Sequence, residues 1–213
     1  MSDPRTDLAA AGARLAALGL SPGSSGNLSV RVDDRILITP TGADLAEVDP
    51  DGLSVLGLDG THLDGPRPSK EFPLHSAFYR RDADIRAVVH LHARNATAVS
   101  CLPPWSPMSA VPPLTPYFVM RVGQTPLVPY APPGDADQAE VLAGLPFPLR
   151  AALLQNHGPV LAGPTMARAV DAAVELEEVS ALLLALGERS PRLLTPEEAG
   201  ALAEKYDSPW GER

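Results

Sequence analysis

Two histidines stand two positions apart in the stretch AVVHLHARN, residues 87–95, at a spacing that suits metal chemistry. Alternate residues of a β-strand share a face, so His90 and His92 should point the same way. His157, in the triplet NHG, adds a third imidazole where Gly158 permits a tight turn. Three neutral imidazoles leave a zinc ion its full charge and an open coordination position, as in a catalytic centre. A pair of metal-free core or surface histidines is the alternative interpretation of HxH.

Glu71 is the acidic residue that we expect nearest to such a centre, where an acid or base would move protons during catalysis. An ordinary exposed carboxylate in the first turn of a helix is the alternative. His75 lies four residues after Glu71 and could share its helix face, so we expect it to support the site or the core rather than bind metal. His62 lies in a turn-rich stretch and is expected to be exposed.

Phosphate binding is the second chemistry that the sequence suggests. Hydroxyls, small residues and backbone N–H groups are the materials of an anion site, and each segment that contains them could equally be a plain turn. Three segments have this composition: SSGN at 24–27, TPTG at 39–42, and Ser69 with Lys70.

The composition favours one acidic globular domain over residues 1–213. A formal net charge of -9 gives no attraction to nucleic acid or to an anionic membrane, so neither is an expected partner. Hydrophobic residues make up 45% of the chain, enough for a substantial core. The lone Cys101 excludes an intrachain disulfide and a Cys-based zinc finger. Without a signal-like N-terminus or a membrane-length apolar segment, the chain is expected to be cytoplasmic.

Periodicity predicts the elements that must position these residues. Strand-like alternation occurs in LSVRV, RILITP, LSVLG and AVVHLH, and AALLQNHGPVLAG should form two strands that pivot on His157. Alternating helices and strands indicate an α/β fold with helices on both faces of a sheet. The apolar pattern predicts amphipathic helices at five places: 4–18, 69–81, 93–102, 165–186 and 195–206.

Two further regions carry specific expectations. Prolines are concentrated between Pro103 and Pro148, which predicts a long, ordered and mostly irregular crossing rather than regular elements. In the long helix 165–186, the acidic side chains are expected to form one solvated face beside a packed one. These acidic residues are Glu175, Glu177 and Glu178.

Read in order, five motifs resemble the class II aldolase/adducin family: SGNLSVR, LITPTG, PSKE, AVVHLHA and NHG. The resemblance spans residues 5–187. It implies a single three-layer α/β/α domain with a central, mostly antiparallel sheet flanked by helices. It also implies a cyclic homotetramer with active sites at subunit interfaces.

The resemblance also implies roles for individual residues. One zinc per subunit, or another divalent metal, would bind to His90, His92 and His157, with Glu71 as the acid or base. Tyr117 matches a tyrosine that a neighbouring aldolase subunit lends to catalysis, and a plain core aromatic is its alternative. Phosphate would be held by four positions: Asn27, Thr41, Gly42 and Ser69.

Within the family, PSKE, VVHLH, NHGPVLAG and the crossing TPYFVMRVGQTPLVPYAPPGD resemble the 3-oxo-tetronate 4-phosphate decarboxylases. The aldolases usually have PSSE where this chain has Lys70. The resemblance therefore implies zinc-dependent decarboxylation of a small phosphorylated sugar acid to dihydroxyacetone phosphate and carbon dioxide, through a metal-chelated enediolate. Lys70 and Arg121 are expected near the two anionic ends of this substrate, because cations pair with carboxylate and phosphate. Solvated surface charges are the alternative for both.

Three other functions stay open at this point. A class II aldolase of the fuculose-1-phosphate type or a ribulose-phosphate 4-epimerase would use the same zinc site. A non-catalytic adducin-type domain is the third, although such domains lack the three metal histidines.

Overall fold

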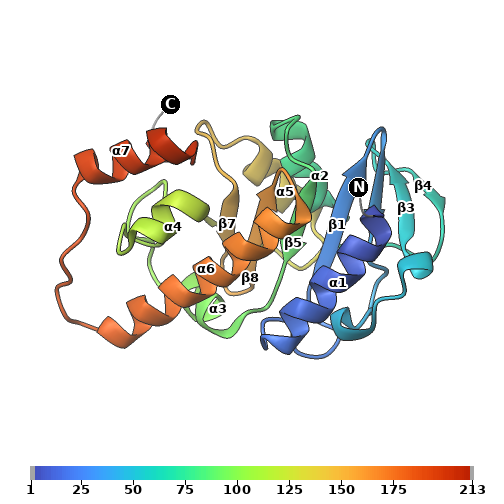
Figure 1. The fold of residues 1–213 in the computed structure, drawn as a ribbon, viewed down its shortest axis with the longest axis horizontal. Coiled ribbons are helices and arrows are strands. Elements are labelled where there is room, and N and C mark those ends of the chain that lie inside the picture. The colour runs from blue at the N-terminus through green and yellow to red at the C-terminus, as the bar shows by residue number, and fades with distance from the viewer. Residues whose placement is uncertain (1–2, 212–213) are drawn as a thin grey trace.

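The computed structural model describes residues 3–211, which form one eight-stranded sheet between two layers of helices (Figure 1). The strands are β1 (Asn27–Val32), β2 (Arg35–Ile38), β3 (Ser54–Gly57), β4 (His62–Asp64), β5 (Ala87–His90), β6 (Leu127–Val128), β7 (Ala151–Leu154) and β8 (Gly158–Gly163). Their order is β4-β3-β2-β1-β5-β8-β7-β6, and all neighbours are antiparallel except β6 and β7. The predicted α/β fold is confirmed.

Helices cover both faces of the sheet. One buried cluster joins residues of the first, third, fourth and sixth helices to one face, and a second joins the second and fifth helices to the other. The last helix packs on the fourth through Val119, Ala199 and Ala203. The helices are α1 (Pro4–Ala17), α2 (Phe72–Arg81), α3 (Arg94–Ser100), α4 (Pro116–Arg121), α5 (Ala136–Ala143), α6 (Met166–Leu186) and α7 (Pro196–Tyr206), with short 3-10 turns at Leu45–Glu47 and Pro50–Gly52.

β5 lies in the middle of the sheet, between β1 and β8, and its side chains alternate between the two cores. Ala87 and Val89 pack into the cluster with α1 and α6, whereas Val88 packs into the cluster with α2. This is the period of two expected for a strand. His90 follows Val88 onto the side of the sheet that α2 covers.

The helix ends follow the capping residues. Asp3 caps α1 by accepting a hydrogen bond from Arg5 N, and Thr165 caps α6 by accepting one from Arg168 N. α7 opens with a reciprocal capping box, in which Thr195 and Glu198 each accept from the other's backbone N–H. The predicted helices at both ends of the chain and at 165–186 are therefore confirmed, within a residue or two at each end.

Two boundary predictions are wrong, and the crossing, which is mostly irregular as predicted, also contains short regular elements. α2 begins at Phe72 rather than Ser69, because Ser69 pairs by its backbone with Thr39. β5 ends at His90, so His92 lies beyond the strand. The proline-rich crossing contains α4, β6 and α5, because proline is compatible with the first turn of a helix and Pro116 opens α4 there.

In the part of the chain that the structure describes, no helix has the length and apolar character needed to cross a membrane.

Candidate metal centre

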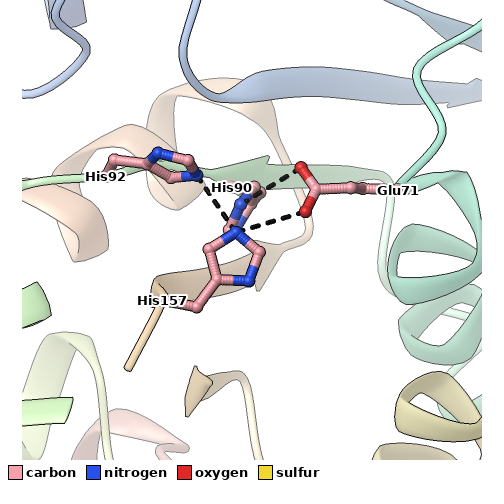
Figure 2. Close-up of side chains that lie close together, drawn as sticks. All are labelled: Glu71, His90, His92 and His157. Carbon is pink, nitrogen blue, oxygen red and sulfur yellow. Dashed lines mark hydrogen bonds and ion pairs between the residues drawn. The ribbon is translucent and has the colours of Figure 1, made fainter. Parts of the chain in front are cut away.

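Four side chains from separate parts of the chain meet at the end of β5 (Figure 2). His90 is the last residue of β5, and His92 follows two positions later. His157 lies in the turn between β7 and β8, and Glu71 is the residue from which α2 starts. One possible ligand atom from each residue lies within 4.8 Å of the others. The three predicted metal histidines and the predicted acid or base thus converge.

His90 is oriented by its backbone neighbour across the sheet. Its Nδ1 lies 3.0 Å from the carbonyl oxygen of Pro159. Because a carbonyl oxygen only accepts, Nδ1 carries the proton and Nε2 keeps a free lone pair. Nε2 is buried without a hydrogen bond and lies 3.3 Å from Glu71 Oε2. This tautomer is the one that a metal ligand needs.

His157 completes the cluster from the turn of the β7–β8 hairpin. Its Nε2 lies 3.1 Å from Nε2 of His92 and 3.3 Å from Oε1 of Glu71. The three imidazole rings stand edge to face, with centroids 4.9 to 5.2 Å apart. The nitrogen atoms therefore point toward a common volume rather than stacking against one another (Figure 2).

The protonation states suit a divalent cation. Burial lowers the pKa of His90 to about 4, and burial also lowers the pKa values of His92 and His157, so all three rings are neutral at pH 7. Burial acts to raise the pKa of Glu71, but His90 and the hydrogen bond from the Asn27 amide outweigh burial, so the pKa lies below its usual value and the group is a carboxylate at pH 7.

The buried polar atoms of the cluster also lack partners. Glu71 Oε1 and His90 Nε2 make no hydrogen bond, and an unpaired buried polar atom is costly. Three neutral nitrogens and one carboxylate form a donor set that zinc and similar divalent metals accept. The residues present therefore fit the expected metal.

Gly158 allows the hairpin that carries His157 to approach the residues after β5. A Cβ atom at this position would overlap the carbonyl oxygen of Leu91 and lie 3.5 Å from the Cα of His92. The absence of a side chain therefore lets His157 and His92 come together.

Glu177 supports the same region from α6, which corrects one expectation. It is 8% exposed rather than solvated, because its carboxylate accepts hydrogen bonds from Asn95 N, Asn95 Nδ2 and Ala96 N. These groups lie at the start of α3, just after His92. A carboxylate is stabilised at a helix N-terminus by the unpaired N–H groups there.

Two of the three predicted phosphate segments lie side by side. Pro40 and Pro68 form an isolated β-bridge, and Ser69 N donates to the carbonyl oxygen of Thr39. Thr41 and Gly42 are exposed beside this bridge, and Gly42 has a φ of +76°. Ser69 is buried, and its Oγ accepts from Glu71 N, so this segment adjoins the metal cluster.

Asn27, from the third segment, is already engaged in the protein interior. Its Nδ2 donates to Glu71 Oε2 over 2.9 Å, and its Oδ1 lies 2.6 Å from Nε2 of His75. Its contact with phosphate stays a prediction, whereas its contact with Glu71 is a role that the sequence did not suggest.

Lys70 is exposed. Burial is the main cause that lowers the pKa of His157, Glu71 acts to raise it, and the charge of Lys70 adds to the lowering. The predicted site residues on α4 lie elsewhere. Tyr117 is 53% exposed, and the guanidinium of Arg121 lies over its ring, 4.9 Å from the centroid. Arg121 also pairs with Glu175 over 3.6 Å. The structure therefore brings Lys70 near the cluster and places Tyr117 and Arg121 together on the surface.

The supporting role expected of His75 is confirmed, because His75 is fully buried and contacts Asn27 and Ser29. Ser29 and Tyr79 were not expected to take part. Their signal was present in the sequence, because Glu71, His75 and Tyr79 recur every fourth residue and Asn27 and Ser29 alternate on a strand. The expected exposure of His62 is confirmed as well.

Known proteins resemble this chain in sequence and in fold. Residues 6–184 match the family model described as Class II Aldolase and Adducin N-terminal domain. A 3-oxo-tetronate 4-phosphate decarboxylase from Pectobacterium atrosepticum is 44% identical over 200 residues, which is 93% of this chain and 92% of that protein. An L-fuculose phosphate aldolase from Escherichia coli is 34% identical over 194 residues, 89% of this chain and 87% of that protein.

A solved structure agrees with these matches. The crystal structure of YgbL from Klebsiella pneumoniae superposes with a TM-score of 0.89 at 44% identity, covering 93% of this chain and 97% of that one. The resemblance inferred from the five motifs is confirmed. Decarboxylases and aldolases that break carbon–carbon bonds are both lyases. The family match and the identities to these enzymes therefore show that the chain belongs to the class II aldolase and adducin family and is a lyase.

Proposed function

We propose that this chain is a zinc-dependent decarboxylase that converts a 3-oxo-tetronate 4-phosphate to dihydroxyacetone phosphate and carbon dioxide. The observation that carries the proposal is the convergence of His90, His92, His157 and Glu71 in a chain 44% identical to an enzyme of that name. One zinc ion per subunit is proposed on the three imidazoles, and another divalent metal could replace it.

The substrate class explains why a cation is needed. The C1 carboxylate is β to the C3 ketone, so breaking the C1–C2 bond releases carbon dioxide and leaves an electron pair shared between C2 and the C3 oxygen. When bound, a divalent cation supplies positive charge that stabilises this developing negative charge. One proton added at C2 then gives dihydroxyacetone phosphate.

Glu71 is the group proposed to handle that proton. Its side chain is buried, ionised at pH 7 and held by Asn27, and its Oε1 makes no hydrogen bond. A carboxylate in this state can orient a water molecule, take a proton from it and pass a proton to C2.

The two anionic ends of the substrate need separate partners. We assign the phosphate to the segments of Thr41, Gly42 and Ser69, because the Pro40–Pro68 bridge holds them together beside Glu71. Asn27 is assigned to its rim. The carboxylate end is assigned to Lys70, whose charge acts on His92 and His157.

Assembly completes the proposal. Tyr117 and Arg121 would serve the active site of a neighbouring subunit in a homotetramer, because both lie on the surface of α4. The one continuous sheet supports a single-domain chain, and the metabolic relatives support a cytoplasmic location. The acidic composition supports the absence of nucleic acid and membrane partners.

The test is a pair of assays on the zinc-loaded protein. The two C2 configurations of 3-oxo-tetronate 4-phosphate are assayed separately, and carbon dioxide and dihydroxyacetone phosphate should appear together from at least one of them. Release of an aldehyde from L-fuculose 1-phosphate, without carbon dioxide from the tetronates, would contradict the proposal. That second outcome would support an aldolase, which is the alternative because the chain is 34% identical to an L-fuculose phosphate aldolase. An epimerase that uses the same site would release neither an aldehyde nor carbon dioxide.

A further inference from the structure

A chain of buried polar side chains leads away from the metal cluster into the protein. Tyr79 Oη lies 2.7 Å from Ser29 Oγ, and Ser29 Oγ lies 2.7 Å from His75 Nδ1. His75 Nε2 lies 2.6 Å from Asn27 Oδ1, and Asn27 Nδ2 donates to Glu71 Oε2 over 2.9 Å. None of the five side chains belongs to a residue more than 6% exposed. We call this set of five residues the relay.

Two secondary-structure periods interleave to form the relay. Glu71, His75 and Tyr79 are spaced four residues apart, which places them along one face of α2. Asn27 and Ser29 are alternate residues of β1 and share the strand face that α2 covers. Each strand residue therefore lies between two successive residues of this row. Asn27 contacts Glu71 and His75, and Ser29 contacts His75 and Tyr79.

The direction of every hydrogen bond in the relay follows from its last member. A carboxylate only accepts, so Asn27 uses its NH₂ group on Glu71 and presents its carbonyl oxygen to His75. That oxygen only accepts, so His75 carries its proton on Nε2, and its unprotonated Nδ1 must accept from the Ser29 hydroxyl. Because this uses the one hydroxyl proton of Ser29, Tyr79 must donate to Ser29. All four donors thus point toward Glu71.

We infer that Tyr79, Ser29 and His75 are positioning residues that act through Asn27 to fix the orientation of the Glu71 carboxylate. Oε2 is held by the relay, so the carboxylate cannot rotate without leaving a buried amide unpaired. Oε1 is therefore directed at the cluster, 3.3 Å from His157 Nε2. The inference rests on the proposed function, because it takes that cluster as the metal centre.

The surroundings keep this proton arrangement in place at neutral pH. Burial lowers the pKa of His75 to about 3, so the ring is neutral, and burial raises the pKa of Tyr79, so the hydroxyl keeps its proton. Apolar residues of similar size would fill the same space without a desolvation cost, so a buried polar chain in which every neighbouring pair is hydrogen-bonded indicates a purpose beyond packing.

The first test reads the histidine tautomer in metal-free protein. Two-bond ¹H–¹⁵N correlation spectra of ¹⁵N-labelled protein distinguish the two neutral imidazole tautomers, and the signals lost in His75→Gln identify the ring. We expect His75 in the Nε2–H form. The Nδ1–H form would reverse the direction of the relay and overturn the inference.

The second test compares two serines with the same burial. Ser29 and Ser54 are both fully buried on strands, and the Ser54 hydroxyl donates to the carbonyl oxygen of Pro66 instead. Glu71 belongs to the four-residue donor set, so losing its support should weaken zinc binding. Ser29→Ala should do so about tenfold, the range seen when a group that supports a ligand is removed, while Ser54→Ala should stay within about twofold. Equal zinc affinities of the two variants, measured by competition with a chromophoric chelator, would overturn the inference.

Two controls separate folding and function from the relay. Tyr79→Phe keeps the ring and removes only the first donor, so it should lose less zinc affinity than Ser29→Ala. If Ser29→Ala does not fold, Tyr79→Phe is compared with Ser54→Ala in its place. A zinc affinity of Tyr79→Phe equal to that of Ser54→Ala would then overturn the inference. A wild-type chain that binds no zinc would contradict the proposed function, and the tautomer of His75 would still decide the inference.

Discussion

The cluster at the end of β5 and the pair on α4 are predicted to serve one reaction, but they differ in how they are held. Glu71 and His90 are 5% and 0% exposed, and hydrogen bonds from their own chain orient both. Tyr117 is 53% exposed and is contacted by the guanidinium group of Arg121, which is itself half-exposed. One chain thus preorganises the candidate metal centre, whereas the catalytic role proposed for Tyr117 depends on the proposed neighbouring subunit.

Removing one imidazole should disrupt the buried region most. Loss of a supporting group already lowers metal affinity about 10–100-fold, so His92→Ala should lower zinc affinity by more than about 100-fold and reduce turnover to background. A chelator competition titration measures the affinity. His62→Ala is the control, since that ring is exposed on β4, and equal affinities in the two variants would contradict the metal assignment.

Replacing the carboxylate should separate chemistry from binding. Glu71→Gln should lower kcat about 10²–10⁴-fold, the contribution of a positioned acid or base, and change KM much less. Steady-state kinetics on a 3-oxo-tetronate 4-phosphate give both constants. A variant with wild-type kcat would remove Glu71 from the mechanism.

Acid should weaken the buried region because its histidines are held neutral. The pKa values of His75 and His90 are about 3 and about 4 in the folded chain and 6.5 in the reference state, so the unfolded chain binds protons first as the pH falls. Stability is therefore fully present above about pH 6.5 and is lost as the pH falls toward these values, by up to about 1.4 kcal/mol per pH unit for each group.

Urea unfolding of chelator-treated protein between pH 7 and pH 4.5 measures this loss. His75→Phe should show a shallower dependence, since only His90 then remains of the two. A free energy of unfolding that is independent of pH in this range would contradict the buried neutral state.

Support for the segment after His92 should depend on one acid of α6. Glu177→Gln should lower the free energy of unfolding by about 1–3 kcal/mol, because buried N–H groups of α3 lose a charged acceptor. Glu178→Gln is the matched control, since the neighbouring side chain is exposed. Urea denaturation compares the two, and equal stabilities would show that the cap is dispensable.

The pair on α4 should give the smallest effect on the isolated chain. Arg121→Ala should change the free energy of unfolding by less than about 1 kcal/mol, as is usual for exposed ion pairs, and leave zinc affinity unchanged. Under the proposed tetramer, Tyr117→Phe lowers turnover while zinc affinity stays constant. A fall in zinc affinity in either variant would show that the two regions are not separate.

The sequence predicted what depends on local pattern. The spacing HxH and a histidine beside a glycine turn predicted His90, His92 and His157, and the apolar runs predicted the strands that these residues end or follow. The sequence did not reveal contacts that need two elements to pack, such as the bond between Asn27 and Glu71. Glu177 looked solvated for the same reason, since a helical pattern cannot show that α3 begins beside it.

The prolines misled in a different way. The residue is incompatible with a helix interior but compatible with a first turn, so its frequency between 103 and 148 obscured α4 and α5. Position relative to a capping residue, such as Thr115 before Pro116, is the more informative signal.

The four-residue spacing along α2 makes its length a functional quantity. Each residue advances a helix by about 100°, so inserting or deleting one position between Glu71 and Tyr79 would turn the tyrosine away from β1 while the carboxylate stayed in place. Residues 103–108 belong to no helix or strand and lie at or near the surface, so they have no helical spacing to keep. The connection could therefore absorb a one-residue change in length. The same change within the ten-residue α2 would separate the Glu71 carboxylate from the hydrogen bonds that hold it.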